Sequence, residues 1–265
     1  MPGKDVILSY FPAPNGWHVH DVVPDLQVRA VRTMPMLSPG LEAEIDRCWA
    51  VAQAYMEGRL FNGRVFSADL ITPALVTGYW TEYRRLVAQM DQHDLFEEIG
   101  VRALSVNGIV LGPDGVVVGR RPAGAMYQPG QWQLAPAGGV DGRSARPDGS
   151  VDVLYAVYSE LREEVGLQAN AVHHPCPLAI VEHGGSHLLD LGIVLRTELT
   201  AAEIRAAHAT AEDDEYAALE MIPPVALPRF IADAGASLTA QMPMFLTRMG
   251  FLSRRAAVDM PMTGN

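Results

Sequence analysis

The sequence predicts an α+β protein, or a mixed α/β sandwich, because runs of strands are interrupted by only a few long helices. Two observations support this class. The second half carries several strand patterns separated by turn signals, and one long amphipathic helix there ends at Gly166. The composition suits a folded globular chain, since 49% of the 265 residues are hydrophobic and 19% are charged.

A charged stretch over residues 91–100 divides the chain into two predicted parts. We expect a small N-terminal α+β extension over residues 1–97 and a larger domain over residues 98–252. Residues 253–265 are expected to form a flexible tail.

The N-terminal part is expected to contain two strands and two helices. Residues 26–33 and 64–72 have strand patterns, and residues 81–90 have the apolar spacing of a helix. Ser38 followed by proline is a typical helix start, apolar residues then recur at helical spacing, and Gly58 closes this helix.

The second part begins with two strands that a Gly-Pro-Asp-Gly turn joins at residues 112–115. A helix is expected over residues 151–165, with Ser150 as its N-cap and Asp152 in its positive first turn. The other expected strands cover residues 101–111, 116–121, 131–135, 178–183, 187–197 and 216–222, and the other expected helices cover residues 227–233 and 238–249.

The charge balance limits the function classes. The net charge is −11 and basic residues form no run longer than two, which argues against a nucleic-acid partner. The two cysteines, Cys48 and Cys176, lack the spacing of a metal site. Neither a signal peptide nor an apolar run of about 20 residues is present, so we expect a soluble, cytoplasmic protein without a membrane partner.

Three glutamates on the long predicted helix point to metal chemistry. Residues three and four apart share a face of a helix, so Glu160, Glu163 and Glu164 should project together. Three like charges on one face repel each other, and this repulsion costs free energy. A divalent cation bound among them would remove that cost. Mg²⁺ takes oxygen ligands and also binds phosphates, and it lowers the pKa of an attacking water.

This helix end resembles the Nudix box. The matching residues are Glu160, Leu161, Glu163, Glu164, Gly166 and Leu167. The Gly-Gly segment at residues 134–139, the strand end at 119–122 and the acidic loop at 213–216 also resemble this family, so the likeness covers residues 101–235. It implies a Nudix-like α/β/α sandwich around a mixed sheet, with the box as loop, helix and loop.

The box departs from the family pattern at several positions. Ser159 stands where the family has an arginine that orients the glutamates, and Val151 stands where it has its first glutamate. An insertion over residues 141–149 accounts for the shifted glycine, and Asp152 lies one position after the missing glutamate. The later glutamates are intact, which favours a divergent but active site.

The resemblance implies a role for each remaining site residue. Glu160 and Glu164 would be the main ligands of Mg²⁺ or Mn²⁺, with Glu163 as a third ligand. Glu160 would also polarise the attacking water, and Glu215 is the alternative base, beside Glu212 and Asp213.

Substrate contacts are expected from four further residues. The backbone at Gly138 and Gly139 would approach the metal or the phosphates, because glycine permits close contact. Arg120 or Arg121 could bind a phosphate through its fork of donors.

The expected reaction is hydrolysis of a diphosphate linkage in a nucleoside diphosphate derivative, with a small molecule as the partner. Residues 61–66 are similar to a segment of Nudix proteins that act on nucleotide sugars, so we favour that class. Two alternatives stay open: a Nudix domain that only binds a nucleotide, and an isomerase or hydrolase of isoprenoid diphosphates. The sequence also leaves open whether the protein is a monomer or a homodimer.

Overall fold

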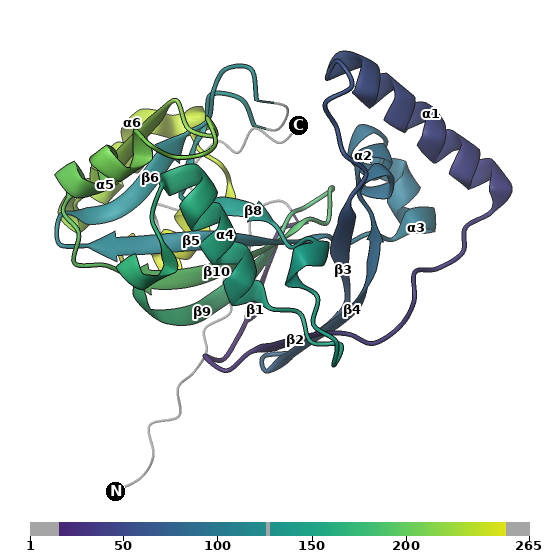
Figure 1. Cartoon of the computed structure of the whole chain (residues 1–265), viewed down its shortest axis with the longest axis horizontal. Coiled ribbons are helices and arrows are strands. Elements are labelled where there is room, and N and C mark those ends of the chain that lie inside the picture. The colour runs from purple at the N-terminus through teal and green to yellow at the C-terminus, as the bar shows by residue number, and fades with distance from the viewer. Residues whose placement is uncertain (1–15, 126–127, 253–265) are drawn as a thin grey trace, which may run out of the picture.

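The computed structural model describes residues 16–125 and 128–252, and it contains two sheets (Figure 1). The tail predicted over residues 253–265 lies outside the described residues. None of the helices in the described part has the length and apolar character that crossing a bilayer requires.

The larger sheet has eight strands in the order β1-β9-β10-β5-β6-β11, with β7 paired to β6 and β8 paired to β5. Its strands are β1 (His18–Asp21), β5 (Leu104–Gly112), β6 (Gly115–Arg120), β7 (Trp132–Leu134), β8 (Ala137–Gly139), β9 (His173–Glu182), β10 (Leu189–Arg196) and β11 (Ala218–Ile222). β10 runs parallel to β5, while the other pairs are antiparallel, so the sheet is mixed as predicted.

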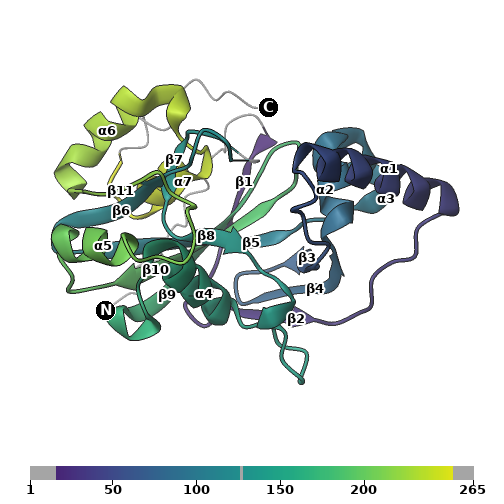
Figure 2. The same cartoon turned by 45° about the horizontal axis from the view of Figure 1, so that its top comes forward.

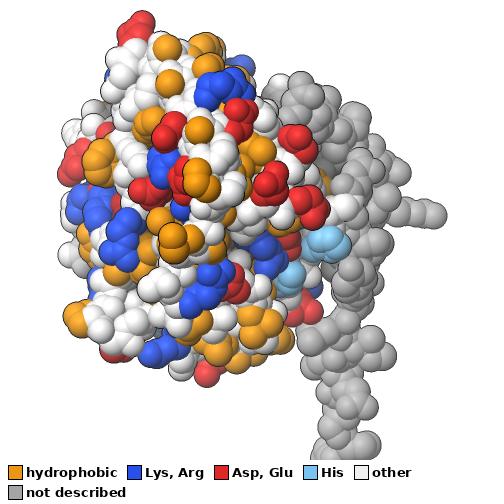
Figure 3. Space-filling model, turned by 90° about the vertical axis from the view of Figure 1, so that its right-hand side faces the viewer, with side chains coloured by type: hydrophobic (Ala, Val, Ile, Leu, Met, Phe, Trp, Pro, Cys, Tyr) orange, Lys and Arg blue, Asp and Glu red, His pale blue; other side chains and the backbone are white. Residues whose placement is uncertain are grey.

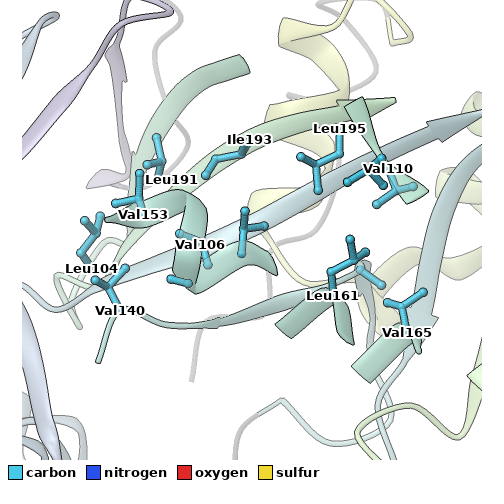
Figure 4. Packing of buried hydrophobic residues seen from close by; sticks show 14 of the residues in the cluster. Leu104, Val106, Val110, Val140, Val153, Leu161, Val165, Leu191, Ile193 and Leu195 are labelled. Carbon is cyan, nitrogen blue, oxygen red and sulfur yellow. The ribbon is translucent and has the colours of Figure 1, made fainter. Parts of the chain in front are cut away.

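Helices cover both faces of this sheet (Figure 2). α4 (Val153–Val165) and α5 (Ala201–His208) pack on one face, and α6 (Leu227–Ala234) and α7 (Gln241–Arg248) pack on the other. Figure 4 shows Leu161 and Val165 of α4 in one hydrophobic cluster with Val106 and Val110 of the sheet, and all four are fully buried. The predicted α/β/α sandwich is therefore confirmed.

The smaller sheet belongs to the N-terminal part and has the order β2-β4-β3. The elements of this part are β2 (Gln27–Ala30), α1 (Pro39–Tyr55), β3 (Arg64–Ile71), β4 (Leu75–Glu82), α2 (Tyr83–Asp91) and α3 (Phe96–Ile99). Ser38 caps α1 as predicted, because its Oγ accepts a hydrogen bond from the Leu41 amide at 3.2 Å. α1 and α2 are further joined by ion pairs, including Arg84 with Glu42 at 2.7 Å. Figure 3 shows basic and acidic side chains interspersed on this side of the molecule.

The segment between the two predicted parts is folded rather than a simple linker. It forms a 3-10 turn, η2 (His93–Leu95), followed by α3, and Leu95 and Ile99 are buried. β1, which precedes this segment in the chain, pairs with β9 of the larger sheet. The division at residues 97 and 98 therefore stays a prediction.

The smaller sheet supports the segment 140–151, which leads from β8 to α4. At the start of this segment, the Phe66 amide donates to the Val140 carbonyl at 3.0 Å. At its end, the Val151 amide donates to the Val28 carbonyl at 2.8 Å. Strands β3 and β2 thus hold the two ends of the segment that includes the predicted insertion.

Candidate active site

Helix α4 carries the three predicted glutamates, and its start differs from the prediction. Asp152 is the N-cap, since its Oδ1 accepts a hydrogen bond from the Tyr155 amide at 2.9 Å. Ser150, the predicted cap, instead donates its hydroxyl to Asp148 at 2.6 Å. Gly166 ends the helix in the left-handed conformation at φ 75°, as predicted.

Glu164 is the most deeply buried of the three, with 4% of its surface exposed. Its Oε2 accepts hydrogen bonds from the Ala137 amide at 2.9 Å and from the Tyr216 hydroxyl at 3.0 Å. The Tyr216 hydroxyl in turn accepts a hydrogen bond from Gln133 Nε2 at 2.8 Å. Burial, followed by the negative charge of Glu160, raises the pKa of Glu164 well above its ordinary value.

Glu160 lies against the backbone of β8. A Cβ atom at position 138 would lie 2.3 Å from Cδ of Glu160, so any other residue at this position would displace the carboxylate from its present place. By contrast, a Cβ atom at Gly139 would meet no atom within 4 Å. Burial, with the charge of Glu163 second, raises the pKa of Glu160 to about 7. Among the described residues, no hydrogen bond reaches either carboxylate oxygen of Glu160.

Glu163 has a different environment, because two arginines pair with it. Its Oε1 lies 2.7 Å from Arg162 Nη2 and 3.2 Å from Arg143 Nη1. The Asp213 amide also donates to the Glu163 carbonyl at 3.0 Å, and Arg162 pairs with Glu212 at 3.4 Å. The acidic loop is therefore attached to the end of α4.

The other predicted residues lie at the end of β6, directly after it, and on the acidic loop. Arg121 Nη1 pairs with Glu215 Oε1 at 2.6 Å, and 13% of the Arg121 side chain is exposed. Arg120 Nε donates to the Gly130 carbonyl at 3.3 Å, and its guanidinium lies 6.0 Å from the centre of the Trp132 ring. The charge of Glu215 also acts on both Glu160 and Glu164, so this residue is close to the carboxylate pair.

The chemistry of the carboxylate pair fits a divalent cation. Glu160 and Glu164 are two hard oxygen donors, and the negative charge of Glu160 adds to the cost of ionising the buried Glu164. In residues 16–125 and 128–252, no set of three or more histidine, cysteine, aspartate or glutamate side chains is arranged to hold a metal ion. Glu163, paired with its arginines, stays a predicted third ligand.

Three contributors to this site were not predicted from the sequence. They are the Tyr216 hydroxyl, Gln133 and Arg143. Tyr216 is the last residue of the segment 213–216 that the family resemblance had marked, so a signal for its place was present. Arg143 lies within the predicted insertion, where no sequence pattern indicates its contact with Glu163.

The comparisons with known proteins give structural neighbours only. No protein-family model matches this chain, and no curated protein matches it. Solved structures do match. A Nudix hydrolase from Nitrosomonas europaea is 12% identical and has a TM-score of 0.39, with 56% of this chain and 87% of that chain covered.

Two other structures show a similar degree of likeness. The MutT Nudix hydrolase from Burkholderia pseudomallei is 18% identical, covers 55% of this chain and 95% of its own, and has a TM-score of 0.37. A Nudix hydrolase from M. smegmatis is 20% identical, covers 61% of this chain and 88% of its own, and has a TM-score of 0.35. Each of these three solved structures is thus similar to more than half of this chain. All three are named as Nudix hydrolases, the family that the box resembles.

Proposed function

We propose that this protein is a Nudix-type hydrolase that uses Mg²⁺ or Mn²⁺ to split a diphosphate linkage in a nucleoside diphosphate derivative. The observation that supports this most is the buried Glu164 together with the partly buried Glu160, which lies against the backbone of Gly138. Two carboxylates in such a place cost free energy unless a cation neutralises them. A cation that binds both carboxylates and phosphates removes this cost and selects a phosphorylated substrate.

The chain's own residues would divide the work in the following way. Glu160 and Glu164 would hold the metal ion, which when bound supplies charge neutralisation of the diphosphate and a more acidic water. Hydrogen bonds from the Ala137 amide and the Tyr216 hydroxyl fix the carboxylate of Glu164. Glu160 would also polarise the attacking water and accept its proton.

The bond changes of the proposed reaction balance without a further reactant. The water oxygen bonds to one phosphorus while the bond between that phosphorus and the bridging oxygen breaks. One water proton passes to the base, and the bridging oxygen leaves on the other phosphate. For a nucleotide sugar, our preferred substrate class, the products are a nucleoside monophosphate and a sugar phosphate.

Glu215 is the second candidate for the base. It lies close enough for its charge to act on Glu160, but Arg121 pairs with it at 2.6 Å. Arg121 therefore holds the carboxylate of Glu215 in place, which favours Glu160 as the group that approaches the water. Glu215→Gln tests the choice, because it should keep kcat within about tenfold if Glu160 is the base and lower it by about a hundredfold or more if Glu215 is the base.

A nucleotide-binding protein without catalysis is the alternative that a specific observation favours. Ser159 and Val151 replace two residues of the box, and both are buried with 5% exposure, so neither offers a charged group to the site. In this case a nucleoside diphosphate would bind without being hydrolysed.

The test is an activity screen with nucleotide sugars, dinucleotides, nucleoside triphosphates and prenyl diphosphates, each with Mg²⁺ or Mn²⁺. Wild type is compared with Glu164→Gln and with Glu220→Gln, which removes an exposed carboxylate on β11. We expect metal-dependent release of a nucleoside monophosphate that Glu164→Gln abolishes and Glu220→Gln leaves unchanged. Binding without turnover of any substrate would refute the hydrolase and establish the binding protein, and turnover of prenyl diphosphates alone would name a different substrate class.

A further inference from the structure

Arg143 lies on the segment between β8 and α4, and Asp141 fixes its place there. The 3-10 turn η3 (Gly142–Ser144) begins after Asp141, whose Oδ1 accepts a hydrogen bond from the Arg143 amide at 2.8 Å. The Oδ2 of the same carboxylate accepts a hydrogen bond from Arg143 Nε at 2.7 Å. One aspartate therefore holds both the backbone and the guanidinium of Arg143.

A second carboxylate holds the other side of this guanidinium. Arg143 Nη1 lies 3.2 Å from Glu163 Oε1, and the charge of Glu160 also acts on Arg143. Within the described residues Nη2 has no partner, and 49% of the side chain is exposed. The guanidinium is thus fixed by Asp141 and Glu163 while one edge with N–H donors faces outward.

The other arginines near the carboxylates are less suited to bind an anion. Arg121 is largely buried and pairs with Glu215. Arg162, like Arg143, pairs with two carboxylates, Glu163 and Glu212, but its Nη2 already lies 2.7 Å from Glu163 Oε1, closer than Nη1 of Arg143 at 3.2 Å. Arg143 combines exposure, a fixed orientation and proximity to the carboxylate pair.

The backbone that carries Arg143 is itself fixed by the smaller sheet. The bridge between Val65 of β3 and Asp141 places this turn against the N-terminal part. A Cβ atom at Gly142 would lie 3.3 Å from Cβ of Arg64, so the turn packs closely on β3. A guanidinium held on a fixed backbone loses little conformational entropy when it binds a ligand.

We propose that Arg143 binds the substrate's diphosphate, donating from its outward edge to a non-bridging phosphate oxygen. This inference rests on the proposed function for the kind of substrate. The planar guanidinium presents N–H groups in the geometry that phosphate oxygens accept, and its charge offsets the acidic surroundings. Asp141 acts as a positioning residue for Arg143.

The test is calorimetric titration with α,β-methylene ADP, a nucleoside diphosphate whose bridging carbon cannot be hydrolysed, in the presence of Mg²⁺. We expect Arg143→Ala to raise its Kd by about tenfold, the equivalent of about 1.4 kcal/mol. Arg143→Lys keeps the charge but loses the fork, so most of this loss should remain. Asp141→Asn should raise the Kd by about threefold, because Arg143 is then held from one side only.

The matched control is Arg205→Ala, which removes an exposed positive charge from α5 and should leave the Kd unchanged. Equal Kd values for wild type and Arg143→Ala overturn the inference, even where the protein hydrolyses a diphosphate. Failure of the wild-type protein to bind the analogue also overturns it. If the analogue binds through Arg143 but no substrate is cleaved, the inference stands and the proposed hydrolysis fails.

Discussion

Replacing Glu160 by glutamine removes a carboxyl group whose pKa lies at about 7 instead of its ordinary 4.5. Burial is the main cause, and the negative charge of Glu163 is the second. Glutamine has a similar shape and stays neutral at every pH. The difference in the free energy of unfolding between wild type and Glu160→Gln therefore measures how much the charge at this position destabilises the folded state when no metal is bound.

The sign follows from linkage between proton binding and folding. The folded protein binds the proton of Glu160 more tightly than the unfolded chain does, so this group stabilises the fold at low pH. That stabilisation is fully present below pH 4.5 and is lost as the pH rises to about 7 and beyond. The gap between these two pKa values corresponds to about 3 kcal/mol in the free energy of unfolding.

The assay is urea unfolding in the presence of a chelator, at pH 5 and at pH 8.5, for wild type and Glu160→Gln. From the lower to the higher pH, the variant should gain about 2.5 kcal/mol relative to wild type, less than the full gap because pH 5 lies above the ordinary pKa of 4.5. Adding Mg²⁺ at pH 8.5 should stabilise wild type more than the variant, because a cation that binds the native site favours the folded state. Glu220→Gln, on the surface, should follow wild type at both pH values. If the difference between wild type and Glu160→Gln does not change with pH, the reasoning about this buried carboxylate is refuted.

Three further changes test the packing around the site by thermal unfolding. Tyr216→Phe should cost about 1 kcal/mol, because Glu164 and Gln133 each lose a buried hydrogen-bond partner; an unchanged melting temperature would contradict this. Gly119→Ala should cost about 1–3 kcal/mol, since its Cβ atom would lie 2.4 Å from the Tyr216 ring, whereas Gly124→Ala meets no atom within 4 Å and should be neutral. Phe66→Ala should cost about 3–5 kcal/mol because this ring is fully buried, and a small loss would show that the smaller sheet does not share the main core.

Most strands of the larger sheet follow from local sequence patterns. Its strands β1 and β8, strand β4 of the smaller sheet, and helices α3 and α5 do not. The sequence predicts a helix from Thr81, but β4 continues to Glu82. Gly78 obscures this strand, yet the position needs glycine, because a Cβ atom there would lie 2.0 Å from the Ser67 carbonyl on β3. Such a requirement comes from a neighbouring strand and is not visible in the local pattern.

The candidate site, too, could be predicted only in part from local sequence patterns. The spacing of Glu160 and Glu164 on one helix face could be predicted, and their role as metal ligands stays a prediction. Contacts between distant segments could not be predicted, such as the hydrogen bond from Tyr216 to Glu164 across 52 positions of the chain. Only the folded structure shows that Arg143, on the inserted segment, reaches the same helix end.

Strands β2 and β3 hold the segment 140–151 in place. Residues from both parts of the chain therefore determine the shape of the site. Cutting the protein near residue 98 would leave every glutamate of the box in the larger piece. That piece would lack the Phe66 amide that binds Val140 and the Val28 carbonyl that binds Val151. The two parts are therefore not interchangeable modules, and exchanging the N-terminal part for another sequence would alter the shape of the site without touching one of its carboxylates.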